Sequence, residues 1–276
     1  MFTTLVSPGF LAANTEWRVI DCRHDLLNVD AGRLAYDAGH VPGAVHAHLD
    51  RDLSGPKTGT NGRHPLPDAA KFCSWLGRAG ITPGTPVVAY DEGSGSHAAR
   101  LWWLMRWVGH SRVCVLDGGW ASWEVQERPR SREVVSYPEQ TYAGAPRREL
   151  VVTAADVEAN LAESQFLVVD ARGAARFAGT EEPIDPVAGH IPGAVNRPYT
   201  ENLLAGRFKA AQTLRDEFEA LLRGKPPTAV VHQCGSGVTA CHNLLAMEHA
   251  GLRGSRLYAG SWSEWCSDAG RPVVTR

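Results

Sequence analysis

Short, mainly apolar runs alternate with longer segments of helical periodicity in both halves of the chain. Apolar runs bounded by turn residues predict buried strands, and apolar residues three and four positions apart predict helices. The predicted strands are Arg18 to Asp21, Pro86 to Tyr90, Arg112 to Leu116, Phe166 to Asp170, Ala229 to Gln233 and Arg256 to Leu257. The predicted helices are Asp68 to Ala79, Ala98 to Val108, Ala154 to Ala162 after a Thr153 cap, Thr213 to Leu222 and Cys241 to Ala250.

This alternation predicts an α/β fold, in which each domain holds a mainly parallel sheet flanked by helices. The chain has 276 residues, of which 43% are hydrophobic. That length and apolar content suit two domains with one core each.

Three blocks of the first half return in the same order in the second half. The matched blocks are Val19 to Arg23 with Val168 to Arg172, Gly39 to Val45 with Gly189 to Val195, and Asp117 to Trp123 with Tyr258 to Trp265. A repeat of this length is a domain and not a solenoid unit. The sequence therefore predicts domains at residues 1–128 and 149–276, joined by a charged, proline-containing linker at 129–148.

Composition bears on where the protein is located and on which partners it can bind. The 28 Lys+Arg nearly balance the 30 Asp+Glu, which argues against nucleic acid or an anionic membrane as a partner. The first residues lack the features of a signal peptide, and no apolar run is long enough to span a bilayer. Six cysteines without a Cys-x-x-Cys pair and 11 histidines without ligand spacing predict neither disulfides nor a metal site. We expect a cytoplasmic protein with free thiols and no cofactor.

One cysteine stands where chemistry is expected. Cys234 follows an apolar strand and precedes the glycine-rich turn Gly235-Ser236-Gly237-Val238-Thr239 and a helix. Backbone N–H groups of such a turn and the helix N-terminus favour the thiolate, which is the nucleophilic form. We expect Gly235, Gly237, Val238 and Thr239 to bind the substrate. We expect Ser236 to donate a hydrogen bond to a leaving group and Thr239 to cap the helix. The alternatives are a buried core cysteine and a plain turn serine.

The repeated blocks and the Cys234 loop resemble the rhodanese-like sulfurtransferases in their tandem two-domain form. The resemblance covers nearly the whole chain and includes the Gly-His-(Val/Ile)-Pro-Gly-Ala segments at Gly39 and Gly189. It implies that Cys234 takes a sulfane sulfur from a small anionic donor and becomes a persulfide. The sulfur then passes to a thiol acceptor, such as thioredoxin or glutathione, or to cyanide. Gly235 and Ser236 resemble the 3-mercaptopyruvate branch, since thiosulfate-preferring members have Arg and Lys there.

Three alternatives remain at this point. The first is a thiosulfate-specific enzyme. The second is a Cys-dependent phosphatase, whose longer loop ends in an arginine where this chain has Ala240 and Cys241. The third is a non-catalytic binding module, against which the presence of Cys234 argues.

The repeat alignment predicts that the first domain is catalytically silent. Asp91 falls at the position of Cys234, and a carboxylate does not accept sulfur as a thiolate does. We expect Cys22, Cys73 and Cys114 to be small buried thiols.

Other candidate site residues rest on the resemblance. Asp50 and His64 match an Asp and a His proposed to form a relay with the loop serine, and a solvated charged loop is the alternative. Arg176 matches the arginine that binds the donor carboxylate, as a planar guanidinium does well. A second arginine usual in the branch is absent, because residues 180–185 are short and acidic. Arg197 or Arg172 is the expected substitute. His40 and His190 are expected to pack and to form hydrogen bonds.

Overall fold

The computed structural model describes residues 3–275 and divides into two compact units. Unit 1 consists of Met1–Gly55, Pro67–Arg147 and Ala205–Phe208, and unit 2 of Pro56–Leu66, Arg148–Leu204 and Lys209–Arg276. Two short segments are grouped with one unit although the residues before and after them belong to the other. They are Pro56–Leu66, grouped with unit 2, and Ala205–Phe208, grouped with unit 1. Residues 129–147, for which the sequence predicts a linker, count with unit 1, where the Tyr137 hydroxyl donates to the carbonyl of Gly43 at 2.8 Å.

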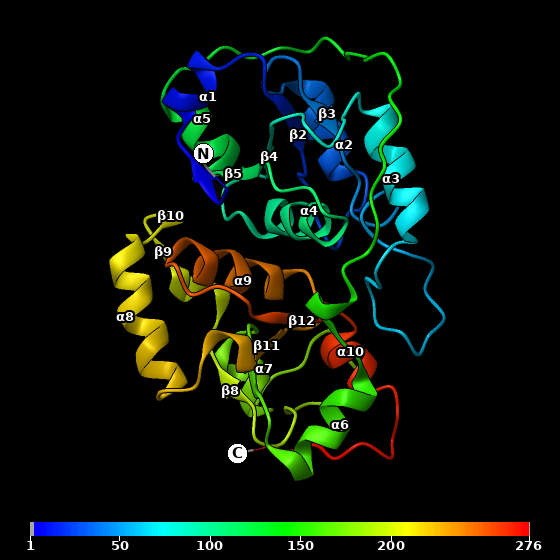
Figure 1. Cartoon of the computed structure of the whole chain (residues 1–276), viewed down its shortest axis with the longest axis vertical. Coiled ribbons are helices and arrows are strands. Elements are labelled where there is room, and N and C mark those ends of the chain that lie inside the picture. The colour runs from blue at the N-terminus through cyan, green and yellow to red at the C-terminus, as the bar shows by residue number, and fades with distance from the viewer. Residues whose placement is uncertain (1–2, 276) are drawn as a thin grey trace. The chain divides into compact units, whose positions relative to one another are not determined.

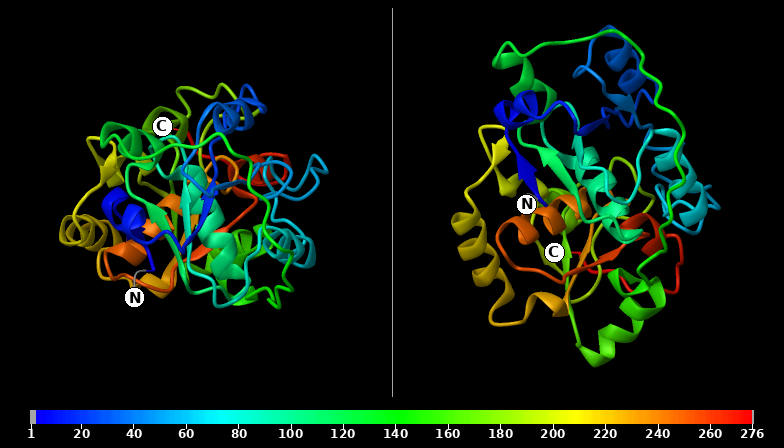
Figure 2. Two further views of the ribbon diagram at one scale, coloured as in Figure 1. Left: turned by 90° about the horizontal axis from the view of Figure 1, so that it is seen from above. Right: turned by 45° about the horizontal axis from the view of Figure 1, so that its top comes forward.

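Unit 1 is built on a parallel five-stranded sheet in the order β1-β5-β4-β2-β3. Helix α4 packs against β4 and β5, and the strands run between helices in Figures 1 and 2. The strands are β1 (Leu5–Val6), β2 (Arg18–Asp21), β3 (Val45–His46), β4 (Val87–Tyr90) and β5 (Val113–Leu116). The helices are α1 (Pro8–Ala13), α2 (Ala31–Ala38), α3 (Ala69–Arg78), α4 (Ser96–Trp107) and α5 (Gly119–Val125).

Unit 2 repeats this architecture, with a parallel sheet in the order β6-β12-β11-β7-β8. Helix α8 packs beside α9, and α10 beside α6 (Figure 1). The strands of the main sheet are β6 (Val151–Val152), β7 (Leu167–Asp170), β8 (Val195–Asn196), β11 (Val230–Gln233) and β12 (Arg256–Tyr258). Strand β9 (Leu203–Leu204) also counts with unit 2, whereas β10 (Arg207–Phe208) counts with unit 1. The helices are α6 (Ala154–Glu163), α7 (Ala174–Ala178), α8 (Ala211–Leu222), α9 (Thr239–His249) and α10 (Ser261–Trp265), with short 3-10 turns at Arg148–Leu150, Tyr199–Asn202 and Pro227–Ala229.

The duplication predicted from sequence is confirmed in strand register. Asp21 at the end of β2 lies opposite Tyr90 of β4, and Asp170 at the end of β7 lies opposite Gln233 of β11. The residues that follow the central strands, Asp91 and Cys234, are therefore equivalent. Both lie at the carboxyl edge of a parallel sheet, where open α/β sheets bind ligands.

A buried ion pair recurs at this edge in both units. Arg23 donates to both carboxylate oxygens of Asp21 and, at 2.7 Å, to the carbonyl of Gly39, with its guanidinium over the ring of Trp120. In unit 2, Arg172 repeats these contacts with Asp170, the carbonyl of Gly189 and the ring of Trp262. The pair joins three of the repeated sequence blocks, which explains why the blocks occur together.

The histidines of the repeated segment have the structural role expected of them. His40 Nδ1 lies 2.7 Å from the carbonyl of Tyr36, and the two rings stack at 3.9 Å. His190 Nδ1 lies 2.8 Å from the carbonyl of Phe177, with the rings stacked at 3.8 Å. Each histidine thus fixes the end of a short helix against the chain that follows it.

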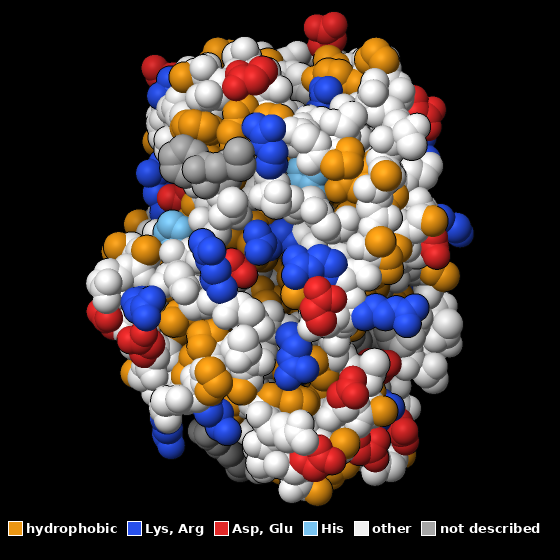
Figure 3. All heavy atoms as spheres, in the orientation of Figure 1, with side chains coloured by type: hydrophobic (Ala, Val, Ile, Leu, Met, Phe, Trp, Pro, Cys, Tyr) orange, Lys and Arg blue, Asp and Glu red, His pale blue; other side chains and the backbone are white. Residues whose placement is uncertain are grey.

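Two general features of the described chain bear on function. Among residues 3–275, no helix combines the length and the apolar character needed to cross a membrane. Lys and Arg side chains share the face drawn in Figure 3 with Asp, Glu and hydrophobic side chains, in keeping with the balanced composition.

Candidate active site

Cys234 directly follows β11, and its side chain is the centre of the loop that leads to α9. The thiol sulfur accepts hydrogen bonds from the backbone N–H of Ser236, at 3.4 Å, and of Gly237, at 3.1 Å. The residue is buried, so these dipoles act in a medium that screens them less than water does. Two converging N–H groups stabilise negative charge on sulfur, whether it belongs to a thiolate or to a persulfide.

The glycines of the loop are required by close approaches. Gly237 has φ of +76°, and a Cβ atom there would lie 2.2 Å from the carbonyl oxygen of Ala259. A side chain at this position would displace the loop from the sulfur. Gly235 has a different neighbour, because its Cβ would lie 2.7 Å from Arg63 Nη2 and 3.4 Å from Arg176 Nη1. Two guanidinium groups therefore flank the residue after Cys234.

The expectation that Thr239 caps the helix is wrong. Helix α9 begins at Thr239, and its N-cap residue is Val238, which makes no side-chain cap bond. The backbone of Val238 is already helical, with φ −88° and ψ −64°, so the helix begins one residue earlier than a threonine cap requires.

Helix α10 holds the loop from the other side. The N–H of Cys234 donates to Ser261 Oγ at 3.1 Å, and Ser261 Oγ donates to the carbonyl of Tyr258 at 2.9 Å. The carbonyls of Cys234 and Gly235 accept from the N–H groups of Trp262 and Ser263, each at 3.0 Å. The last repeated sequence block therefore supports the loop that holds Cys234.

His64 reaches the loop serine. Segment Pro56–Leu66 belongs to unit 2, where the N–H of Arg63 donates to Ser263 Oγ at 3.0 Å. His64 Nδ1 then lies 2.8 Å from Ser236 Oγ, and both side chains are buried. This pair is able to pass a proton between an imidazole and a hydroxyl next to Cys234.

Arg176, from α7, and Arg63 share a network of acidic partners. Arg176 donates to Glu182 at 2.7 Å and to Asp185 Oδ2 at 3.1 Å, while Arg63 Nη1 donates to Asp185 Oδ1. Although burial opposes ionisation, the hydrogen bond from Arg176 and those from the N–H groups of Asp185 and Ile184 hold the pKa of Glu182 below its ordinary value. The acidic segment thus pairs with the arginines beside the loop.

The second cation at the loop is Arg63, and not one of the two arginines expected from sequence. Arg172 is committed to Asp170, the carbonyl of Gly189 and Glu182. Arg197 is buried and bonded to Asn202 and Glu217. The only signal for Arg63 in the sequence is its position next to His64, because its partners Asp185 and Ser263 follow it by 122 and 200 residues.

The other cysteines lack the environment of Cys234. Burial raises the pKa of Cys22, with Asp21, Asp91 and Asp52 adding to the effect. Burial also raises the pKa of Cys73 and of Cys266, and it raises that of Cys114 to about 12. Cys241 Sγ donates to the carbonyl of Gly237 at 3.3 Å. These groups are thiols at neutral pH or donors to backbone, and neither state favours nucleophilic attack.

Asp91 fills the equivalent loop of unit 1 with its own carboxylate. Its Oδ1 accepts from the N–H groups of Gly93, at 3.0 Å, and Gly95, at 2.9 Å, and its Oδ2 from those of His97 and Ala98. The carbonyl of Asp91 accepts from the N–H of Trp120 at 2.8 Å, as that of Cys234 does from Trp262. The anion cradle is therefore preserved in unit 1 and permanently occupied.

We expect Asp91→Ala to lower stability and to leave sulfur transfer within a few-fold of the parent. Four N–H groups, two of them buried and two part-buried, lose a charged acceptor, which costs about 1–3 kcal/mol of the free energy of unfolding. Urea denaturation measures that loss, and steady-state kinetics on the folded variant measure turnover. A hundredfold loss of activity in a folded Asp91→Ala protein would contradict a silent first domain.

Asp50 lies in unit 1, next to two histidines. Asp50 Oδ2 is 4.0 Å from His24 Nε2, and the N–H of Asp50 donates to His48 Nδ1 at 3.1 Å. Burial, followed by the charge of His97, lowers the pKa of His24 to about 4, so His24 is neutral at physiological pH. The relay from Asp50 to His64 stays a prediction, since the two residues belong to different units.

The same residues form a cluster that the sequence did not reveal. Ligand atoms of His24, His48 and Asp50 all lie within 4.8 Å of one another, although the spacing of the histidines predicted no cluster. Ligands of one zinc ion lie roughly 3–3.5 Å apart when each is about 2 Å from the metal. His48 Nδ1 already accepts a backbone hydrogen bond. We assign no metal to this cluster.

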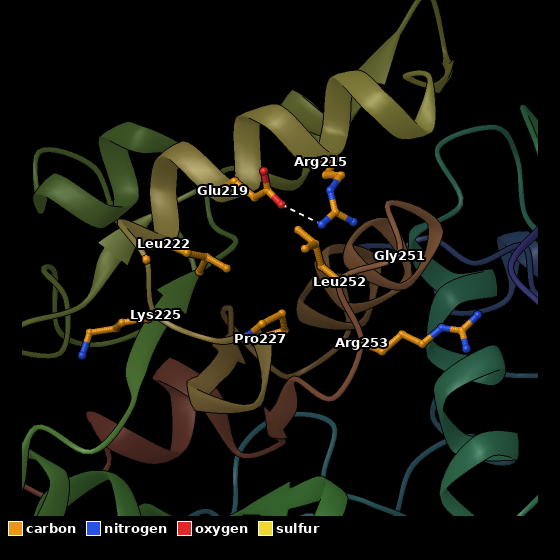
Figure 4. Close-up of a pocket in the computed structure, with 9 residues that line it drawn as sticks. Arg215, Glu219, Leu222, Lys225, Pro227, Gly251, Leu252 and Arg253 are labelled. Carbon is orange, nitrogen blue, oxygen red and sulfur yellow. Dashed lines mark ion pairs between the residues drawn. The ribbon is translucent and has the colours of Figure 1, made fainter.

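A cavity of about 650 Å³ lies elsewhere in unit 2, between α8 and the turn after α9 (Figure 4). Arg215 and Glu219 form an ion pair of 2.8 Å along its wall, and Lys225 and Arg253 extend in opposite directions. Pro227, at the amino end of β11, also lines the cavity. Cys234 follows the other end of that strand, so this cavity is separate from the Cys234 loop.

Comparisons with known proteins agree with this geometry. The model of the rhodanese-like domain matches residues 11–126 and 153–268. A Pseudomonas aeruginosa protein named "Probable 3-mercaptopyruvate sulfurtransferase" is 46% identical over 260 residues, covering 93% of this chain and 92% of that protein. The thiosulfate sulfurtransferase of Gallus gallus is 36% identical over 84% of this chain and 80% of its own length.

Solved structures show the same relationship. The crystal structure of SseA from Escherichia coli, described as one of the 3-mercaptopyruvate sulfotransferases, has a TM-score of 0.81 and 32% identity. The match covers 95% of this chain and 99% of SseA. With two matched domains and the same order of repeated blocks, the chain belongs to the rhodanese-like sulfurtransferases in their tandem two-domain form.

Proposed function

We propose that this sulfurtransferase moves a sulfane sulfur from 3-mercaptopyruvate, through a persulfide on Cys234, to a thiol or to cyanide. The observation that carries the proposal is the pair of N–H groups, from Ser236 and Gly237, that converge on Cys234 Sγ. The names of the relatives from Pseudomonas aeruginosa and Escherichia coli support the choice of donor.

In the first step, the Cys234 thiolate attacks the thiol sulfur of the donor. An S–S bond forms and the C–S bond breaks, so the electron pair of that bond passes to the methylene carbon. The proton of the donor thiol, relayed through Ser236 and His64, ends on this carbon and yields pyruvate. The 2.8 Å separation of His64 Nδ1 and Ser236 Oγ supports the relay. Charge balances, because thiolate and mercaptopyruvate become persulfide anion and pyruvate.

In the second step, an acceptor nucleophile attacks the outer sulfur and releases the Cys234 thiolate. The N–H groups that stabilise the persulfide anion also stabilise the departing thiolate, so the loop serves both half-reactions. We propose a thiol such as that of thioredoxin or glutathione, or cyanide, as the acceptor. A reducing compartment such as the cytoplasm suits this chemistry, and all six cysteines are free.

The charges beside the loop favour a donor with a single negative charge. Arg63 and Arg176 face the loop, but Asp185 and Glu182 balance them. The loop itself offers Gly235, Ser236 and Gly237, which carry no cation. A carboxylate is matched by one guanidinium fork, whereas thiosulfate, a dianion, needs more positive charge than this network has left.

Steady-state kinetics with the two donors test the proposal. With cyanide as acceptor at fixed pH, we expect a higher kcat/KM for 3-mercaptopyruvate than for thiosulfate, with measurable activity for both. Pyruvate release and thiocyanate formation are followed in parallel, so the two products must appear in equal amounts. A tenfold or greater preference for thiosulfate would exclude this donor assignment and favour the second candidate, a thiosulfate sulfurtransferase like the Gallus gallus relative.

A phosphatase is not favoured by the loop. Such an enzyme needs an arginine at the end of the loop to bind phosphate, and this chain has Ala240 and Cys241, both buried within α9. A module that only binds sulfur compounds would have no need of a cysteine at the centre of these N–H groups.

A further inference from the structure

Asp185 stands out among the residues around the nucleophile loop, because its carboxylate joins two arginines. Oδ1 accepts from Arg63 Nη1 and Oδ2 accepts from Arg176 Nη2 at 3.1 Å. Its side chain is 3% exposed, while those of Arg63 and Arg176 are 27% and 19% exposed. The Asp185 carboxylate is therefore buried, whereas both guanidinium groups keep part of their surface exposed.

Both arginines border the residue that follows the nucleophile. A Cβ atom on Gly235 would lie 2.7 Å from Arg63 Nη2 and 3.4 Å from Arg176 Nη1. A carboxylate donor whose sulfur meets Cys234 has these guanidinium groups as its nearest cations. The donor anion and Asp185 consequently compete for N–H groups of the same two side chains.

Glu182 differs from Asp185 in its bonding. Glu182 accepts from Arg176, from Arg172 and from the N–H groups of Ile184 and Asp185, so it fixes the course of its segment. The hydrogen bonds of the Asp185 carboxylate within the described chain go to Arg63 and Arg176. Glu182 therefore fixes the backbone of its segment, whereas the negative charge of Asp185 offsets positive charge on Arg63 and Arg176.

We propose that Asp185 is a specificity-determining residue, an internal carboxylate that lowers the affinity of the site for anions and disfavours dianionic donors more than monoanionic ones. The proposal rests on the proposed function. With Asp185 and Glu182 opposite Arg63 and Arg176, the four charges sum to zero. Without Asp185 one positive charge is uncompensated, and its attraction for a dianion is twice that for a monoanion at the same distance.

The test compares donor preference in Asp185→Asn with that in the parent. Asparagine keeps the size and one acceptor oxygen but removes the charge. We expect KM to fall about tenfold for 3-mercaptopyruvate and up to about a hundredfold for thiosulfate, because the interaction scales with donor charge. The ratio of the two kcat/KM values then shifts about tenfold towards thiosulfate. Asp185→Glu, which keeps the charge, should retain the preference of the parent.

Glu219→Gln is the matched control. It removes one negative charge from unit 2 at the exposed ion pair with Arg215, on the wall of the separate cavity (Figure 4). Solvent and salt screen such a charge, so we expect both KM values to stay unchanged. If Glu219→Gln and Asp185→Asn changed the two KM values equally, the effect would come from the net charge of the protein alone, and the proposal would be overturned.

A binding measurement tests the proposal even if Asp185→Asn also changes kcat. In a Cys234→Ser background, calorimetry with sulfate as the dianion and pyruvate as the monoanion reports affinity without chemistry. Asp185→Asn should strengthen the binding of sulfate more than that of pyruvate. If Asp185→Asn leaves both affinities unchanged, or weakens both equally, Asp185 only positions the arginines. These outcomes leave the proposed function untouched, since that function fails only if the parent transfers no sulfur from 3-mercaptopyruvate.

Discussion

Cys234→Ser abolishes sulfur transfer, with an expected loss of about a thousandfold or more, while the fold survives. A serine hydroxyl is a poor nucleophile at neutral pH, and an oxygen at this position forms no persulfide. The loop keeps its shape, because its N–H groups still meet an acceptor where Sγ stood. Steady-state kinetics with either donor measure the loss, and thermal unfolding verifies that the variant is folded.

Cys73→Ser provides the control for this substitution. It makes the same chemical change at a buried thiol whose pKa is raised by burial, and to which no role is assigned. Activity within a few-fold of the parent is expected there. If Cys73→Ser and Cys234→Ser lost activity equally, the loss would reflect damage to the fold and not removal of a nucleophile.

Arg176→Ala raises KM for 3-mercaptopyruvate by about ten- to a hundredfold, with a smaller effect on kcat. A charge-assisted hydrogen bond in a partly buried site contributes roughly 1.5–3 kcal/mol to binding. The loss also leaves Glu182 and Asp185 without their shared partner, and both then repel an anionic donor. Arg176→Lys should restore only part of the affinity, because an ammonium group lacks the planar fork.

Arg215→Ala is the control for Arg176→Ala, since it removes an arginine from an exposed ion pair in the same unit. Its KM values should equal those of the parent. Unchanged KM in Arg176→Ala would move the donor carboxylate to Arg63, the other cation beside Gly235. It would not move it to Arg197, whose guanidinium is buried against Asn202 and Glu217.

The sequence predicts those strands that form an apolar run and those helices that show a helical period of apolar residues. Strands β2, β4, β7 and β11 and helices α3, α4, α8 and α9 lie within a few residues of their predicted bounds. The two-residue strands β1, β3, β6 and β8 were missed, because two residues carry no periodicity. They form through pairing with neighbours already in the sheet, which is a tertiary effect.

At the site, the local sequence predicts the loop around Cys234, but it does not predict which charged side chains lie beside that loop. The strand, cysteine and glycines follow one another in the chain, so their geometry follows from local rules. The cation Arg63 comes from a distant segment that packs on Ser263, and no local pattern predicts that contact. Residues 180–185 read as an acidic departure from the family, yet their side chains pair with the arginines that flank Gly235.

Locating the transferred sulfur by mass spectrometry tests the central claim most directly. The protein is treated with 3-mercaptopyruvate without an acceptor, its free thiols are blocked, and its peptides are sequenced. The account predicts one additional sulfur atom on Cys234, which disappears when cyanide is added and is absent in Cys234→Ser. An added sulfur on Cys22, Cys73, Cys114, Cys241 or Cys266 in place of Cys234 would contradict the account.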